Sequence, residues 1–205
     1  MAINFQYFAQ PEKFGAFLEE ETTCDFCQQT KHCLDASTFY GEEEIEAICL
    51  DCLANGELKS RDIFTCEGDV EELTRQMQTL HPEWSVAEVE KDVAEKTEIL
   101  EKTTPKVVSW QDWVWPCADG DYCTFIGYGS KALYNRLAKD KDGDWLFQRS
   151  IYHTLKYQAD SDELWEESMP VKEIKDEAAS QDYELLFYVF KSRSSDQLVT
   201  IWDEM

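Results

Sequence analysis

Basic residues are scarce in this sequence. Its 205 residues include 43 aspartates and glutamates but only 19 lysines and arginines, which leaves a formal net charge of −24 at pH 7. A chain with this balance repels nucleic acid and anionic membrane surfaces. It attracts basic proteins and cations, and the charge also keeps the protein in solution. We therefore expect neither a nucleic-acid partner nor a membrane partner.

Long hydrophobic runs are also missing. No stretch is long enough to cross a bilayer, and no apolar segment follows a basic start as it does in a signal peptide. We therefore expect a cytoplasmic protein. In such a reducing compartment, the eight cysteines of the chain favour metal ligation over disulfides.

The usual marks of an enzyme site are absent as well. There is no glycine-rich loop to hold a phosphate and no Gly-x-Ser-x-Gly elbow, and the three histidines are scattered. Carboxylates are so abundant that no catalytic pair stands out. The sequence therefore names no catalytic residue, although its 43 % apolar content allows a packed core.

What the sequence does contain is two cysteine pairs. Cys24 and Cys27 form one Cys-x2-Cys pair, and Cys49 and Cys52 form a second pair after 21 intervening residues. Two such turns close a tetrahedral shell of four thiolates, which favours zinc and leaves no open coordination position. We predict about one structural zinc per chain. Iron, a redox pair or ordinary buried cysteines are the alternative interpretations.

Four other cysteines fit this pattern less well. Cys33 and Cys66 are interpreted as small buried core residues. Cys117 and Cys123 lack partner ligands, so we predict that they bind no metal. Asp119-Gly120-Asp121 between them resembles a fragment of a calcium loop, but a solvated turn is the favoured interpretation.

The predicted fold class is α+β. A cysteine-rich, zinc-ribbon-like module over residues 1–66 is followed by an acidic, mixed α/β region over residues 67–205. Asp69 and Ser85 predict the starts of two amphipathic helices within residues 67–105, each with a capping box. Further helices are expected over residues 130–139 and 145–155. β-Prone segments at residues 183–190 and 197–202 predict a C-terminal β-hairpin.

The chain resembles the CbrC family of bacterial proteins. The matching residues are Phe5-Gln6-Tyr7, Cys24-Asp25-Phe26-Cys27, residues 48–56, Trp110-Gln111, Pro116-Cys117, residues 121–127 and the aromatic strand at residues 183–190. Many relatives follow that strand with another cysteine pair, where this chain has Lys191-Ser192-Arg193-Ser194. The resemblance implies a link to tolerance of nuclease colicins and to immunity proteins of toxin systems.

Two hypotheses of function follow. The first is an immunity-like binding protein that neutralises a basic, nuclease-type toxin, with Glu42, Glu43 and Glu44 as candidate contact residues. An acidic surface would steer a basic partner to the protein. The alternative is a metal-dependent hydrolase that uses the region from Trp110 to Cys123. A zinc ribbon that reads nucleic acid conflicts with the charge.

Overall fold

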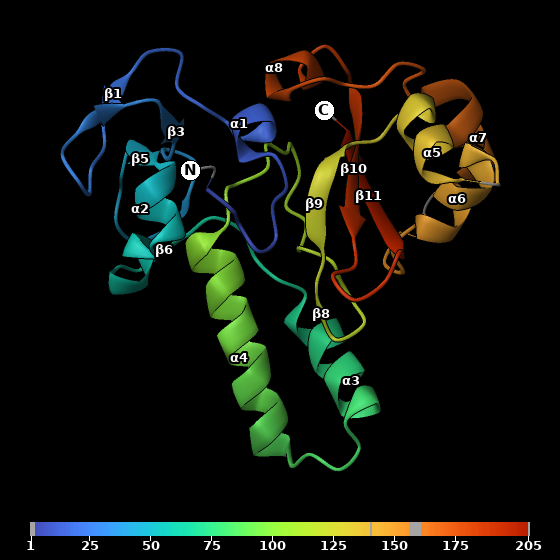
Figure 1. The fold of residues 1–205 in the computed structure, drawn as a ribbon, viewed down its shortest axis with the longest axis horizontal. Helices are drawn as coiled ribbons and strands as arrows, with labels where there is room; N and C mark the ends of the chain where they lie inside the picture. Colours follow the sequence, from blue (N-terminus) through green and yellow to red (C-terminus); the bar gives the residue numbers. More distant parts are fainter. Residues whose placement is uncertain (1–2, 140, 156–160, 205) are drawn as a thin grey trace.

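The computed structural model describes residues 3–139, 141–155 and 161–204, and Figure 1 shows their arrangement. Short strands and helix α2 lie on one side, and a three-stranded sheet with helices α5, α6 and α7 lies on the other. The paired helices α3 and α4 extend below them. The α+β class is confirmed, because helices and small sheets alternate along the chain.

The N-terminal elements are short, and those before α3 are no more than five residues long. They are α1 (Pro11–Phe14), β1 (Thr22–Thr23), β2 (Thr30–Lys31), β3 (Cys33–Asp35), β4 (Tyr40–Gly41), β5 (Ala47–Cys49), α2 (Leu50–Ala54), the 3-10 helix η1 (Glu57–Ser60) and β6 (Ile63–Phe64). They form the antiparallel pairs β1–β2, β3–β5 and β4–β6. Residues 31–40 therefore contribute to three separate two-stranded ladders rather than to one continuous strand.

The remaining elements include the longest helices and strands of the fold. They are α3 (Val70–Leu80), α4 (Val86–Thr103), β7 (Cys117–Ala118), β8 (Asp121–Tyr122), β9 (Thr124–Tyr128), α5 (Lys131–Leu137), α6 (Gly143–Ser150), α7 (Ser161–Glu163), the π-helical turn η2 (Leu164–Ser168), α8 (Glu177–Ser180), β10 (Leu185–Lys191) and β11 (Leu198–Glu204). The predicted C-terminal hairpin is confirmed, because β10 and β11 pair antiparallel along their full lengths. Strand β9 completes the sheet in the order β11–β10–β9.

Strand β10 is the centre of the core. Leu186, Tyr188 and Phe190 belong to the larger apolar cluster, which also contains the buried residues of the cysteine-rich part. Phe187 and Val189 belong to a second cluster under α5 and α6. Alternate side chains of a strand point to opposite faces, so a strand covered on both faces is apolar throughout.

The two predicted surface helices are present, and their first turns differ. Ser85 forms the full capping box with Glu88 at the start of α4. At the start of α3, the Asp69 side chain accepts from the backbone N–H of Glu72, but the Glu72 carboxylate accepts from Arg75 and Gln76 instead of closing the box. The box predicted at Asp69 is therefore only half formed, because the Glu72 side chain bonds within the helix instead.

Contacts with both the sheet and helix α4 join the N-terminal elements to the rest of the chain. The backbone of Tyr7 and Ala9 bonds to that of Phe125 on β9, at 2.8 Å for each of the two hydrogen bonds. Helix α4 packs against α2 and η1. The division predicted at residue 66 stays a prediction, and the two parts share one apolar cluster.

The tryptophan-rich stretch runs in extended form toward β7. Trp115 is completely buried, its ring lies 5.1 Å from that of Phe190, and its indole N–H donates to the Cys123 carbonyl at 2.7 Å. Trp115 is thus part of the main apolar core. No described helix combines the length and the apolar surface that crossing a bilayer requires.

Candidate metal centre

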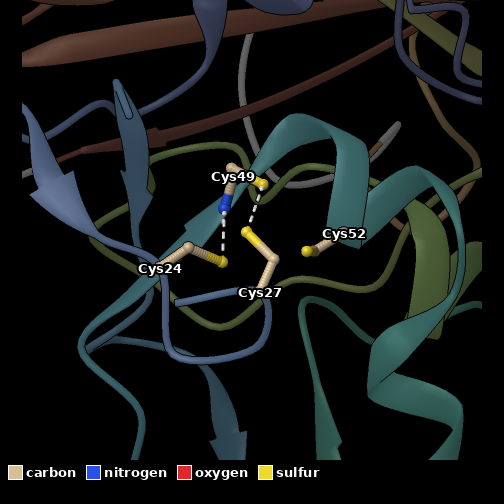
Figure 2. Close-up of side chains that lie close together, drawn as sticks. All are labelled: Cys24, Cys27, Cys49 and Cys52. Carbon is tan, nitrogen blue, oxygen red and sulfur yellow. Dashed lines mark hydrogen bonds between the residues drawn. The ribbon is translucent and has the colours of Figure 1, made fainter. Parts of the chain in front are cut away.

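The first cysteine pair lies on a tight turn between β1 and β2. The backbone N–H of Gln28 donates to the Cys24 carbonyl at 2.9 Å, and that of Cys24 donates to the Gln29 carbonyl at 3.0 Å. Gln28 adopts a left-handed conformation with φ of 57°. These bonds bend the chain back on itself, so that Cys24 and Cys27 present their sulfurs to the same side (Figure 2).

The second pair lies where a strand changes into a helix. Cys49 ends β5 and is the N-cap of α2, and Cys52 lies in the first turn of that helix. The backbone N–H of Cys49 donates to the Cys24 sulfur at 3.4 Å. A strand–helix junction of this kind brings the second pair of sulfurs against the first.

The four sulfurs form a compact cluster. All of them lie within 4.8 Å of one another, and the Cys27 and Cys49 sulfurs are 3.8 Å apart. Four sulfurs at about 2.3 Å from one central zinc ion would stand about 3.8 Å from each other. The cluster therefore has the size of a tetrahedral thiolate shell, and Cys24, Cys27, Cys49 and Cys52 could hold a metal ion.

The electrostatics of the cluster also fit a cation. Burial opposes ionisation of Cys24, but backbone hydrogen bonds at Cys27 and Cys49 outweigh it and lower the pKa of Cys24 to about 7. Burial raises the pKa of Cys49 and of Cys52, and the neighbouring thiols raise the pKa of Cys52 further. Four thiolates this close together need a positive charge between them, so metal binding and loss of the protons are linked.

An aspartate that sequence reasoning gave no role holds the two turns together. The Asp25 carboxylate accepts the backbone N–H of Glu46 at 2.8 Å and that of Ala47 at 2.9 Å. The Asp25 backbone N–H in turn donates to the Ala47 carbonyl at 3.0 Å. Its position between the first two cysteines is the only sequence signal, because the segment whose N–H groups it binds lies more than twenty residues further along the chain.

Cys33 and Cys66 are buried, as predicted for core residues. Cys33 pairs with Cys49 across the β3–β5 ladder, but its sulfur lies outside the cluster of four and 3.4 Å from the Thr22 carbonyl. Burial raises the pKa of Cys33 to about 11 and that of Cys66 to about 12. Both therefore behave as neutral thiols at neutral pH.

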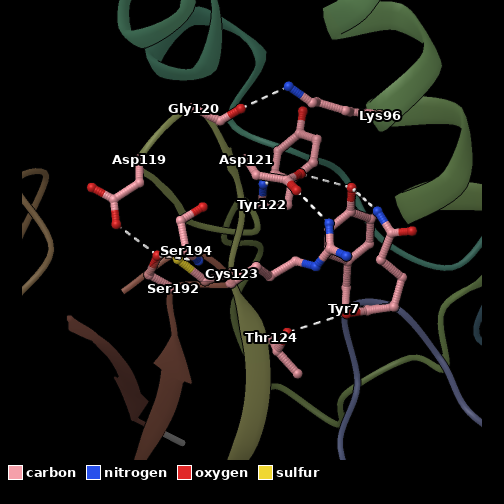
Figure 3. Close-up of polar contacts among 12 residues, drawn as sticks. Tyr7, Lys96, Asp119, Gly120, Asp121, Tyr122, Cys123, Thr124, Ser192 and Ser194 are labelled. Carbon is pink, nitrogen blue, oxygen red and sulfur yellow. Dashed lines mark hydrogen bonds and ion pairs between the residues drawn. The ribbon is translucent and has the colours of Figure 1, made fainter. Parts of the chain in front are cut away.

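Cys117 and Cys123 flank a hydrogen-bonded turn far from this cluster in the sequence (Figure 3). The Asp119 carboxylate accepts from the hydroxyls of Ser192 at 2.7 Å and Ser195 at 2.6 Å. The serines therefore bind an aspartate at the place where many relatives are expected to carry a cysteine pair. That Cys117 and Cys123 bind no metal stays a prediction.

Asp121 has partners of a different kind in the same turn. The Tyr7 hydroxyl donates to one of its carboxylate oxygens at 2.8 Å, and Arg193 forms an ion pair with the other. Lys96 of α4 donates to the Gly120 carbonyl at 2.8 Å. These contacts connect the turn to the N-terminal segment, to α4 and to the loop between β10 and β11. The oxygens of the calcium-loop fragment are therefore used for internal hydrogen bonds.

The three candidate contact glutamates lie on a loop between β4 and β5. Glu42, Glu43 and Glu44 are all exposed, and Glu43 forms an ion pair with Arg61 at 2.9 Å. Strand β5 leads from this loop directly to Cys49. The loop therefore lies shortly before the metal cluster in the chain, and its role in partner binding stays a prediction.

Comparison with known proteins gives a family and no solved counterpart. The model of an uncharacterised protein family, UPF0167, matches residues 3–201. The UPF0167 proteins Mb2317 of Mycobacterium bovis and MT2352 of Mycobacterium tuberculosis are each 32 % identical over 128 residues, which cover 60 % of this chain and 59 % of each relative. The match thus spans about three fifths of the relatives' length. No solved structure matches the chain.

Proposed function

The chain belongs to the UPF0167 family, which is the CbrC family, and from its cysteine cluster we propose that it is a zinc-stabilised protein that binds a basic protein partner. The observation that carries the zinc is the packing of four sulfurs within 4.8 Å of one another. Thiolates select zinc in a tetrahedral site, and four protein ligands leave no position for water. The zinc is therefore structural.

Metal content and coordination test this part of the proposal. We expect one zinc per chain in the purified protein, with four sulfurs at about 2.3 Å in X-ray absorption spectra. Cys49→Ser should lose the zinc, and Cys33→Ala, which changes a neighbouring cysteine outside the cluster, should keep it. A full zinc complement in Cys49→Ser would refute the ligand set.

The net charge of −24 supports a basic partner. Nuclease toxins are basic because they bind nucleic acid, and an acidic protein is steered to them and covers the same surface. The family's expected link to colicin tolerance points to the same class of partner. Strand β5 connects the loop that carries Glu42, Glu43 and Glu44 to Cys49, so in this proposal the zinc anchors one end of the loop, which would lose little entropy on binding.

We propose a cytoplasmic location for the protein from the state of its cysteines. None of the eight cysteines, all of which lie in described residues, forms a disulfide. Thiols persist in reducing compartments, which supports the cytoplasm. An immunity protein that meets a nuclease after its entry into the cell would act there.

Binding kinetics test the partner. A pull-down from cells that express a toxin domain encoded beside this gene should recover the toxin. Association should be about 10- to 1000-fold faster at low salt than at high salt. Replacing Glu42, Glu43 and Glu44 by Gln should slow association more than the same change at Glu19, Glu20 and Glu21, three exposed glutamates elsewhere. Recovery of no basic partner, together with turnover of a small molecule, would favour the hydrolase instead.

The hydrolase alternative has one supporting observation. Cys117, Ala118 and Asp119, which lie in the region from Trp110 to Cys123, line a cleft. A catalytic metal needs an open coordination position, and among the described residues the cluster of four cysteines is the one group placed to hold a metal. The binding-protein proposal therefore agrees better with the site.

A further inference from the structure

A cleft of about 440 Å³ lies away from the cysteine cluster. Helix α3, strand β7, the segment that follows α6 and the start of β11 form its walls. Its volume is in the range of sites that bind small molecules. None of the four clustered cysteines lines it, so a ligand there would be independent of the metal.

The cleft collects basic side chains in a protein that has few of them. Arg75, Arg149 and His153 all line it, although the chain has 43 acidic residues and only 19 lysines and arginines. Arg149 and His153 offer N–H donors to this cleft, and Arg75, which also donates to Glu72 from Nε and Nη2, adds a third basic side chain.

The two acidic residues of the lining are already occupied. The Glu72 carboxylate accepts from Arg75 at 2.5 and 2.7 Å and from Gln76 at 2.8 Å, and its side chain is only 12 % exposed. The Asp119 carboxylate accepts from two serine hydroxyls. Hydrogen bonds lower the pKa of both carboxyls. Both are ionised, and donors of the protein itself satisfy them.

Among the described residues, no carboxylate pairs with the two basic residues on the opposite side, Arg149 and His153. The Arg149 guanidinium lies 5.1 Å from the ring centre of Trp145, and the His153 ring packs edge-on against Tyr152 at 4.4 Å. Ring contacts thus position both groups without using their N–H donors.

The lining beneath them is buried and held by hydrogen bonds. Tyr152 and Cys117 are 6 % and 2 % exposed. The Tyr152 hydroxyl donates to Asp69, the N-cap of α3, at 2.7 Å, and the Cys117 sulfur lies 3.7 Å from that hydroxyl. Burial raises the pKa of Cys117 to about 12. The thiol is therefore neutral, and the cleft is built for binding rather than for attack by a thiolate.

We propose that this cleft binds a small organic anion. Its carboxylate or phosphate group lies between Arg75, Arg149 and His153, and its apolar part covers Tyr152 and Cys117. Guanidinium groups bind both kinds of oxyanion through paired N–H donors. The site adds a small-molecule ligand to the proposed role in protein binding, and it does not depend on that role.

Calorimetric titration of the metal-loaded full chain with four probes tests the proposal. Phenylacetate and phenyl phosphate represent the two anion classes, phenylacetamide is the uncharged counterpart, and inorganic phosphate lacks the apolar part. At least one aromatic anion should bind about tenfold or more tightly than phenylacetamide and inorganic phosphate. Comparison of the two anions identifies the preferred class. In amide NMR spectra, the shifts should centre on Cys117 and Tyr152.

Charge-matched variants locate the site. Arg149→Gln and Arg75→Gln should each weaken binding about tenfold or more, since each removes a charged donor. Arg136→Gln, which removes an exposed arginine of α5 outside the cleft, should leave binding unchanged. All three residues are exposed, and an unchanged urea-denaturation midpoint and circular dichroism spectrum will verify the fold.

Three results would overturn the proposal. They are the absence of binding by both aromatic anions at millimolar concentration, equal binding of phenylacetamide, and an equal loss of affinity in Arg136→Gln. Because the NMR shifts are measured on the unmodified protein, the test stands even where a variant folds poorly.

Discussion

The cysteine-rich module and the three-stranded sheet are stabilised in different ways. The strands from β1 to β6 are two or three residues long, whereas β10 and β11 are seven residues each. Short two-stranded ladders are not stable by themselves in water. Strand β10 is covered on both faces by apolar side chains. In the proposed zinc-bound protein, the module relies on sulfur–metal bonds in addition to apolar burial, whereas the sheet relies on apolar burial alone.

This contrast means that each region has its own point of failure. Loss of a thiolate ligand would remove the connection between the two cysteine pairs, and the short ladders around them would then depend on their apolar residues alone. Loss of a core aromatic ring leaves a cavity but no broken coordination. The predictions below separate these two kinds of failure, in order of expected size.

The largest effect is expected from removing the metal. In Cys49→Ser, amide hydrogen exchange over residues 22–66 should increase strongly, because structural zinc contributes about 10–16 kcal/mol of apparent binding free energy to such sites. Amides of β10 should keep their protection. Cys33→Ala is the control and should exchange like the wild type. Equal loss of protection in both regions would show that they do not differ in this way.

A core substitution should give the opposite pattern. Phe187 is fully buried between α6 and Trp202. Phe187→Ala should therefore lower the free energy of unfolding by about 3–5 kcal/mol. Urea denaturation measures this, and the zinc content of the folded protein should not change. Trp145→Ala is the control, because this ring is 45 % exposed. Release of zinc by Phe187→Ala would link the two regions.

A buried carboxylate should give an intermediate, pH-dependent effect. Asp203 is 2 % exposed and accepts from the Tyr188 hydroxyl at 2.7 Å and the Trp110 backbone N–H at 3.0 Å. Burial raises the pKa of Asp203, although these bonds oppose the rise. The folded state therefore binds the proton more tightly, and the contribution of Asp203 to stability falls as pH rises from about 4 to the raised value.

Asp203→Asn should remove that slope. We expect a loss of about 1–2 kcal/mol that is larger at pH 4 than at pH 7, measured by urea denaturation across this range. Asp196 is the contrasting control. Lys191 and Lys139 lower the pKa of Asp196 to about 2, so its contribution is present above about pH 4 and lost as pH falls through 2. If Asp203→Asn and Asp196→Asn changed the pH dependence of stability in the same direction, the assignment would be contradicted.

The smallest effect on stability is expected on the exposed loop of the module. Glu43→Gln breaks the surface ion pair with Arg61, which contributes about 0.2–1 kcal/mol. The zinc content and the hydrogen exchange of residues 22–66 should stay as in the wild type. Association with a basic partner should slow nonetheless. A large loss of stability would mean that the loop supports the metal site.

Local features were predictable because their causes are local. The starts of α3 and α4 follow from Asp69 and Ser85, which bond within three residues of themselves. The C-terminal hairpin follows from two β-prone segments with a turn between them. The three ladders formed by residues 31–41 could not be predicted in this way, because pairing depends on which distant segment lies beside each residue.

The sequence by itself determined the cysteine cluster. Two residues between the ligands of each pair place both sulfurs on one short turn, and only the meeting of two turns was left to the fold. The tertiary structure alone decided three features. They are the hydrogen bonds of Asp25 to the chain at β5, the burial of Asp203, and the cleft that both Arg75 and Arg149 line. These contacts connect residues far apart in the chain, and their positions depend on how the core packs rather than on spacing.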